Sequence, residues 1–141
     1  MKQPMTSTIC RWNVLAALGL ALALTACGGS TTSPPSAVSV NGCASADYVS
    51  GSTVTFQYPT YTPRCLTIKA GQTVTFNGDF SGHPFAPGVA ASSTGTGSAG
   101  SPITETKTGN SAAFTFSAAG VFPYHCEYHS GNGMFGAVRV Q

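Results

Sequence analysis

The sequence predicts an all-β domain, a β-sandwich, in residues 43–141. Three observations support this class. Apolar and polar residues alternate with a period of two in several stretches, as expected of half-buried strands. Glycine-containing turns separate these stretches, and no segment of this part has a helical period. Several short strands joined by such turns are typical of a sandwich, and we expect them to pair antiparallel.

The expected strands lie in the segments STVTFQY, CLTIKAGQTVTF, AFTFSAAGVFPYHC and GAVRV, the second and third of which hold two strands each. In the first segment, Tyr58 falls on the same face as Val54 and Phe56. The last strand is expected at residues 137–140. Residues 87–112 interrupt this rhythm because they are mostly small and polar. We expect them to form a surface excursion with a short strand at 103–106.

Residues 1–26 are predicted to be a lipoprotein signal peptide. Two positive charges precede the apolar run WNVLAALGLALAL, which is shorter than the roughly 20 residues that span a bilayer. The run ends in LTAC, which resembles the lipobox of bacterial lipoproteins, whose cysteine, here Cys27, is lipidated. An ordinary signal peptide followed by a stray cysteine is the alternative. Gly28 replaces the aspartate that marks inner-membrane retention, which favours the outer membrane if the source is Gram-negative.

Residues 27–42 are rich in Gly, Ser, Thr and Pro and are predicted to be a flexible tether. The domain would then be exported and held at a membrane by the lipid on Cys27, facing the periplasm or the cell surface. Without Lys2 and Arg11, the chain has four basic and four acidic residues. This balance argues against nucleic acid as a partner, and we expect a monomer.

Three cysteines remain after the tether: Cys43, Cys65 and Cys126. Outside the cytoplasm disulfides persist. Cys43 opens the domain, and Cys65 opens a strand on the face opposite Leu66, so we predict that these two cysteines pair. Two free thiols are the alternative. The pairing leaves Cys126 alone, and an unpaired thiol in an exported protein needs an explanation.

The segment CEYHSGNGM offers a thiolate, an imidazole and a thioether from Cys126, His129 and Met134. Strand parity directs Cys126 inward and the adjacent His125 outward, so His125 is excluded as a ligand. His83, in GDFSGHPFAPG, is the expected fourth ligand. Two histidines, a cysteine and a methionine are the ligand set of blue-copper sites. Zinc more often takes further cysteines or carboxylates. The plain alternative is that Cys126 and Met134 are core residues.

From residue 43 to 141 the chain resembles the cupredoxins, above all bacterial plastocyanin-like and azurin-like proteins. CEYHSGNGM has the plastocyanin spacing Cys-x2-His-x4-Met, and TPRCLTIKAGQTVTF and TFSAAGVFPYHC are similar to the family's strands before its ligand histidine and cysteine. The resemblance implies a Greek-key β-sandwich and one copper bound by His83, Cys126, His129 and Met134. The Cys43 and Cys65 pair also resembles the azurin disulfide.

Two positions beside His83 bear on the copper. Pro84 stands where the family often has asparagine, and proline has no N–H to donate to the thiolate, so we expect a lower reduction potential than with asparagine. Gly82 precedes His83, as in azurins, and its carbonyl is a candidate for a weak fifth contact. Pro84, Phe85 and Phe135 are expected to form an apolar rim for docking of redox partners, although Phe85 and Phe135 could instead be core.

The expected function is therefore a one-electron carrier between a donor and an acceptor protein, not an enzyme. A copper-binding module that buffers or delivers the metal is the alternative. A Cys-His hydrolase would need an oxyanion site or an orienting group, and none stands out in the sequence. A copper oxidase or nitrite reductase would need a second copper site, for which only His125 is left.

Overall fold

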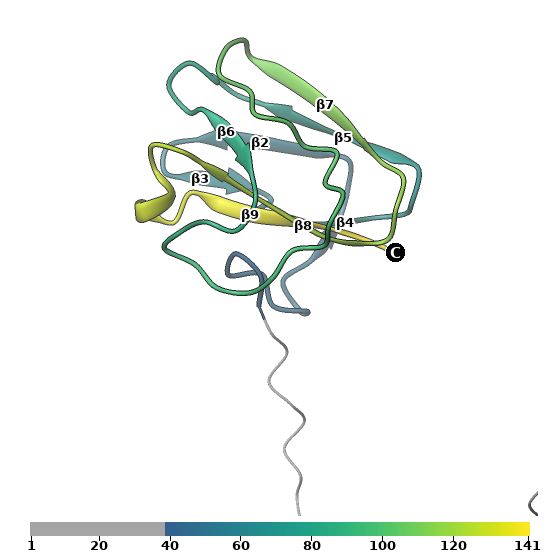
Figure 1. The fold of residues 1–141 in the computed structure, drawn as a ribbon. Coiled ribbons are helices and arrows are strands. Elements are labelled where there is room, and N and C mark those ends of the chain that lie inside the picture. Colours follow the sequence, from purple (N-terminus) through teal and green to yellow (C-terminus); the bar gives the residue numbers. More distant parts are fainter. Residues whose placement is uncertain (1–38) are drawn as a thin grey trace, which may run out of the picture. The chain divides into compact units, whose positions relative to one another are not determined.

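A computed structural model describes residues 39–141, which form two β-sheets packed face to face (Figure 1). The five-stranded sheet has the order β1 (Val49–Ser50), β4 (Cys65–Ile68), β9 (Phe135–Val140), β8 (Gly120–Cys126) and β6 (Phe85–Pro87). The four-stranded sheet has the order β3 (Thr60–Thr62), β2 (Thr53–Gln57), β5 (Gln72–Asn77) and β7 (Ser111–Phe116). The predicted all-β sandwich is confirmed.

The described residues contain one short 3-10 helix, η1 (Ser130–Asn132). Within this part of the chain, no helix has the length and apolar character needed to cross a membrane. The predicted signal peptide and Cys27 lie outside the described residues.

Three of the strand pairs are parallel, namely β1 with β4, β4 with β9, and β2 with β5. The expectation of antiparallel pairing throughout is therefore wrong. The reason is that strands joined by a glycine turn do not always pair. β4 and β5 belong to different sheets, as do β7 and β8. Each connection carries the chain across the sandwich, and Gly71 provides a positive φ of 86° in the first of them.

The main core lies between the two sheets. Buried residues alternate along β2, where Val54 and Phe56 face inward, as the sequence predicts. Phe122, Tyr124 and Cys126 of β8 face inward in the same way. Aromatic rings dominate this core, and such side chains bury about 150–250 Å² each. The last strand begins at Phe135, two residues earlier than expected, because its pairing with β8 continues to His125.

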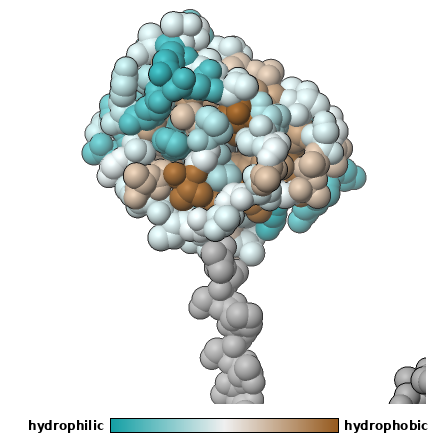
Figure 2. Space-filling model, viewed as in Figure 1, coloured by the Kyte–Doolittle hydropathy of each residue, from teal (hydrophilic) through white to brown (hydrophobic). Residues whose placement is uncertain are grey.

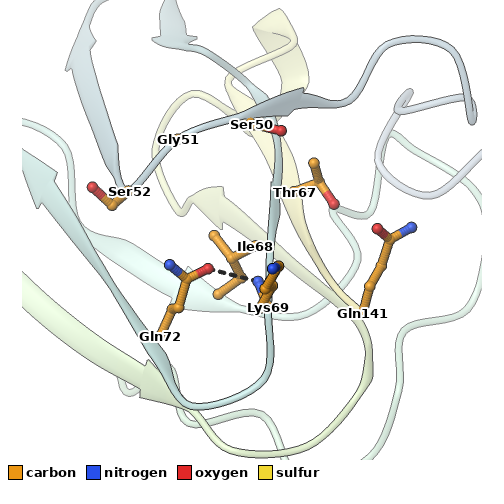
Figure 3. Close-up of a pocket in the computed structure, with 8 residues that line it drawn as sticks. All are labelled: Ser50, Gly51, Ser52, Thr67, Ile68, Lys69, Gln72 and Gln141. Carbon is orange, nitrogen blue, oxygen red and sulfur yellow. Dashed lines mark hydrogen bonds between the residues drawn. The ribbon is translucent and has the colours of Figure 1, made fainter.

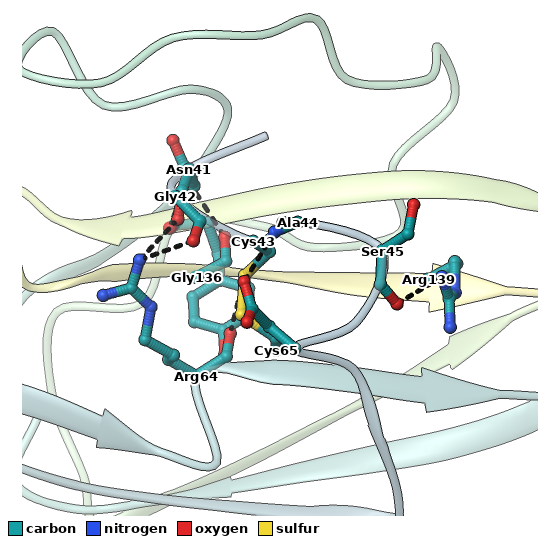
Figure 4. Close-up of a disulfide and its surroundings, with 11 residues drawn as sticks. Asn41, Gly42, Cys43, Ala44, Ser45, Arg64, Cys65, Gly136 and Arg139 are labelled. Carbon is teal, nitrogen blue, oxygen red and sulfur yellow. Dashed lines mark hydrogen bonds between the residues drawn. A yellow bond between two sulfur atoms is a disulfide. The ribbon is translucent and has the colours of Figure 1, made fainter. Parts of the chain in front are cut away.

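The outer face of the five-stranded sheet carries a second, smaller cluster. Cys43, Cys65 and Ala137 are buried there. Cys43 and Cys65 form the predicted disulfide (Figure 4). The Arg64 guanidinium donates a 2.9 Å hydrogen bond to the Gly42 carbonyl. Because Cys65 belongs to this outer cluster, it points away from the main core, while its neighbour Leu66 points into the main core.

Hydrogen bonds of the Asn41 side chain attach the segment 39–43 to the sandwich. Its side-chain amide donates to the carbonyls of Tyr124 at 2.8 Å and Gly136 at 3.0 Å, and its Oδ1 accepts from the Ala90 N–H at 3.0 Å. The side chain is fully buried, and these hydrogen bonds satisfy its polar atoms. The packed part of the chain therefore reaches back to Val40, ahead of Cys43.

The segment between β6 and β7, expected to lie on the surface, is partly buried. Ile103 is buried in the main core, and Ala90 is also buried. Thr106, at the end of the expected short strand, exchanges two 2.9 Å backbone hydrogen bonds with Phe85 but forms only an isolated bridge. The Ser98 N–H donates to the Val121 carbonyl at 2.7 Å.

On the face shown in Figure 2, apolar residues form small patches separated by polar surface.

An open hollow lies at the end of β9 that is farther from Met134. Its lining comes from the end of β1 and the link to β2, the end of β4, the start of β5 and Gln141, as Figure 3 shows. The Lys69 N–H donates to Gln72 Oε1 at 2.7 Å there. The lining is mostly hydroxyl and amide groups, none of them a thiol or an imidazole.

Candidate metal centre

Three potential ligands meet at one end of the sandwich. Cys126 is the last residue of β8 and is fully buried. His129 follows three residues later, immediately before η1, and His83 lies in the connection between β5 and β6. In residues 39–141, these three form a cluster whose ligand atoms lie within 4.8 Å of one another. The short helix η1, which follows His129, lies at the end of β9 that is opposite the C-terminus (Figure 1).

The distances in the cluster fit a single metal ion. The two Nδ1 atoms of His83 and His129 are 3.0 Å apart. The Cys126 Sγ is 3.4 Å from the His129 Nδ1 and 4.0 Å from the His83 Nδ1. A point equidistant from the three atoms lies about 2.1 Å from each, within the range of about 2.0–2.3 Å that protein nitrogen and sulfur ligands keep from a metal such as zinc. The residues present therefore fit a metal centre that could hold one copper.

Backbone hydrogen bonds close the loop that carries Met134. The Cys126 N–H donates to the Met134 carbonyl at 3.0 Å, and the Met134 N–H donates to the His129 carbonyl at 3.2 Å. Gly133, with a φ of 88°, allows the sharp turn at the end of η1. Met134 is fully buried in the main core beside this loop. Its place as a metal ligand remains a prediction.

The protonation of the cluster follows from its burial. Burial raises the pKa of the Cys126 thiol, and hydrogen bonds from the backbone N–H groups of His129 and Tyr128 offset part of this shift. Burial, with the nearby charge of His129, lowers the pKa of His83. Without metal, the cluster thus favours a neutral thiol and a neutral His83 imidazole. Metal binding requires the thiolate, so it releases the thiol proton.

The segment around His83 is held from both sides. The His83 N–H donates to the Asp79 carbonyl at 3.1 Å, and the Glu127 N–H donates to the Pro84 carbonyl at 2.9 Å. Bonds from the side chain and N–H of Ser81 lower the pKa of Asp79. The expected influence of Pro84 on the sulfur remains a prediction. The fifth contact expected from Gly82 remains a prediction.

The predicted apolar rim is wrong in two of its three residues. Phe85 is fully buried because it pairs with Cys126 across β6 and β8, and paired residues share a face of the sheet. Pro84 is buried as well. Phe135 is half-buried, and the Arg64 guanidinium lies 5.5 Å from the centre of its ring. Phe85 is therefore core, which the sequence left open.

Two tyrosines that the sequence analysis did not select lie at the exposed side of the cluster. Tyr58 is 53% exposed, and its ring centre is 4.8 Å from that of His129 and 6.4 Å from that of His83. Tyr128 is 68% exposed, with its ring centre 6.3 Å from that of His129. Tyr58 does not follow the inward face of β2, because that strand ends at Gln57. The proline that follows Tyr58 is the signal that could have indicated this end.

His125 lies outside the cluster, as the sequence predicts. Its Nδ1 is 3.2 Å from the Gly88 carbonyl, on the side of β8 away from the sulfur of Cys126. A histidine directly beside Cys126 in the sequence is thus kept on the other face of the sheet by the alternation of the strand.

A two-sheet sandwich with a His-Cys-His metal centre at one end defines the class of this protein, and comparison with known proteins gives the family. Residues 50–141 match the family described as copper binding proteins, plastocyanin/azurin family. The chain belongs to this family. None of the curated proteins matches it.

Solved structures with a similar fold include three from different organisms. A copper-containing nitrite reductase from Thermus scotoductus SA-01 is 19% identical with a TM-score of 0.49; the match covers 68% of this chain but 28% of the reductase. A purple cupredoxin from Nitrosopumilus maritimus is 22% identical with a TM-score of 0.46, covering 64% of this chain and all of the other, 100%. Amicyanin from Paracoccus versutus is 23% identical with a TM-score of 0.42, covering 74% and 91%.

Proposed function

We propose that the chain is a blue-copper protein that carries single electrons between redox partners outside the cytoplasm. The observation that carries the proposal is the triangle of His83 Nδ1, Cys126 Sγ and His129 Nδ1, which surrounds one point at metal-bonding distance. Copper, when bound, supplies a one-electron couple between Cu(II) and Cu(I). A set of one thiolate, two imidazoles and a thioether is suited to both states.

The fold restricts the positions of the proposed ligand side chains. Cys126 is fixed by β8, and His129 and Met134 by the hydrogen-bonded loop that ends in β9. His83 is fixed by its N–H bond to Asp79. The main core packs against the cysteine side of the cluster and keeps water away from it. A site that is held in one geometry in both oxidation states has little to rearrange when an electron moves.

We propose that electrons pass through the surface formed by Tyr58 and Tyr128. These two rings lie against His129 and are exposed, whereas the Cys126 and Met134 side chains are buried. A small aromatic surface fits the weak, short-lived contacts of redox proteins. It replaces Pro84 and Phe85 of the expected docking rim, because both of these residues are buried.

The test of the proposed function is a copper titration of the purified protein. Wild type should give an intense blue absorption with Cu(II), and Cys126→Ser should remain colourless while keeping its β-sheet circular dichroism. Reversible voltammetry with fast electron exchange should follow for the blue form. A colourless wild-type complex would refute the blue-copper centre. A blue protein with slow electron exchange would favour the alternative role in copper buffering or delivery.

We further propose that residues 1–26 are removed as a signal peptide and that Cys27 carries a lipid, followed by a tether. The Cys43–Cys65 disulfide supports an oxidising compartment. Wild type should fractionate with membranes, and Cys27→Ala should not. Equal membrane association of the two proteins would contradict lipid anchoring.

A further inference from the structure

Asn41 differs from its surroundings in both its burial and its backbone conformation. None of its surface is exposed, and, tyrosine and cysteine apart, it is the one buried polar residue in the described range 39–141. Its φ of 47° is positive, which no other non-glycine residue of this range shares. Asparagine enters this region more often than most residues do. Because a buried amide must be hydrogen-bonded, its partners indicate which parts of the fold the residue holds.

The Asn41 amide bridges β8 and β9 close to the metal cluster. We call these two strands and the loop between them the ligand hairpin. The amide donates to the carbonyls of Tyr124 at 2.8 Å and Gly136 at 3.0 Å, which are register partners on the two strands. Two residues further toward the loop, the Cys126 N–H donates to the Met134 carbonyl at 3.0 Å. Asn41 thus holds both strands two residues away from two of the proposed ligands.

A second connection joins Asn41 to the loop of the same hairpin. Its Oδ1 accepts from the Ala90 N–H at 3.0 Å. Two residues after Ala90, the Ser92 hydroxyl donates to the Ser130 carbonyl at 2.6 Å. Ser130 is the first residue of η1 and directly follows His129. Through this short segment, Asn41 is linked to the loop that carries the histidine of the hairpin.

The segment that carries Asn41 has two separate attachments to the five-stranded sheet. Asn41 attaches it to the ligand hairpin, and the Arg64 guanidinium donates to the Asn41 carbonyl at 3.3 Å (Figure 4). Two residues later, Cys43 attaches the segment to β4 through its disulfide with Cys65. Because β4 carries none of the proposed ligands, the two attachments differ in what they can do for the metal centre.

We propose that Asn41 is a positioning residue of the metal centre, whose hydrogen bonds hold the ligand hairpin in the shape that brings Cys126, His129 and Met134 together. This inference rests on the proposed blue-copper function. Residues that orient metal ligands from outside commonly change the metal affinity by about 10- to 100-fold when they are replaced. Copper binds the hairpin in its native shape, so any loss in the population of that shape lowers the apparent affinity by the same factor.

Three variants remove these connections in different ways. Asn41→Gly deletes the side chain without backbone strain, because glycine accepts the positive φ. Asn41→Asp keeps the size of the side chain but replaces the donor group that faces two carbonyls with an oxygen. Ser92→Ala breaks the connection to the loop at an exposed residue. The control is Cys43→Ser with Cys65→Ser, which loosens the same segment at β4 and leaves Asn41 in place.

The experiment has one readout with copper and one without metal. The affinity for Cu(II) is measured by competition with a chelator, and amide hydrogen exchange of Cys126 and Met134 is measured in the metal-free protein relative to amides of β5. For both Asn41 variants we expect about tenfold weaker copper binding and at least about tenfold faster relative exchange. Ser92→Ala should show a smaller loss, of about threefold. The double cysteine control should match wild type in both readouts.

The outcomes separate this inference from the proposed function. If wild type forms no blue complex, the blue-copper function fails and this inference with it. If wild type is blue and both Asn41 variants bind copper equally well, the role of Asn41 alone is overturned. The same holds if the control loses as much affinity, since general loosening would then explain the effect. If Asn41→Gly does not fold, Asn41→Asp and Ser92→Ala decide, and wild-type affinity in both would overturn the inference.

Discussion

Cys65 on β4 and Cys126 on β8 flank the same central strand, β9, and point to opposite faces of the sheet. Cys65 faces outward, where the first described segment brings Cys43 to it and a disulfide forms. Cys126 faces inward, where two histidines approach it, and among residues 39–141 it is the one cysteine outside the disulfide. Strand parity therefore decides which sulfur crosslinks the chain and which can bind a metal. The disulfide region should contribute stability, and the cluster region should contribute redox chemistry.

We expect the largest effect on stability from loss of the disulfide, and we expect it to leave the metal centre unchanged. Replacing both cysteines, as Cys43→Ser with Cys65→Ser, should lower the free energy of unfolding by about 3 kcal/mol, because a loop of this length no longer restrains the unfolded chain. The copper spectrum of the folded fraction should stay the same. Denaturant titration and absorption spectra measure the two effects. A changed spectrum at full folding would mean that the two regions are coupled.

A smaller effect is expected at Pro84, within the cluster region. Pro84→Asn adds a backbone N–H beside the thiolate, and one such bond should raise the reduction potential by on the order of tens of millivolts. Voltammetry of the copper-loaded protein measures the shift. Pro87→Asn, on the exposed last residue of β6, serves as the control and should leave the potential unchanged. An equal or lower potential in Pro84→Asn would refute this prediction.

The smallest effect should be kinetic. Tyr58→Ala removes the exposed ring beside His129 without removing a ligand. We expect the electron self-exchange rate to fall several-fold while the potential and the unfolding midpoint stay close to wild type. Line broadening in mixtures of the oxidised and reduced protein measures this rate. Tyr48→Ala, in the disulfide region, is the control for loss of a tyrosine ring. If both variants exchange electrons at the wild-type rate, the surface at Tyr58 is not the route.

The sequence predicted the orientation of Cys126, Cys65 and His125 because alternation along a strand is a local property. It also grouped His83 with Cys126 and His129, and the structure brings these three side chains together. The burial of Phe85 could not be predicted in this way. Its inward orientation depends on the pairing of β6 with β8, which no local pattern encodes. The same holds for the parallel pairs. β2 and β5, for example, meet only because the chain crosses between the sheets.

Other features depended on single residues whose partners lie far along the chain. Asn41 looked like part of the tether, yet its side chain bonds to backbone groups of β8 and β9. Ile103 lies in a polar segment and is nonetheless part of the main core. Tyr61 lies in β3, a strand that the sequence analysis did not expect, and its inward orientation becomes visible only when both sheets are in place.

The most direct test of the metal centre is a crystal structure of the copper-loaded protein. We predict one copper ion bonded to His83 Nδ1, Cys126 Sγ and His129 Nδ1, with the Met134 sulfur at a longer distance. The Cys43–Cys65 disulfide should be intact in the same crystals. Copper bound at His125, or a Cys126 sulfur that is not bonded to the ion, would contradict the account.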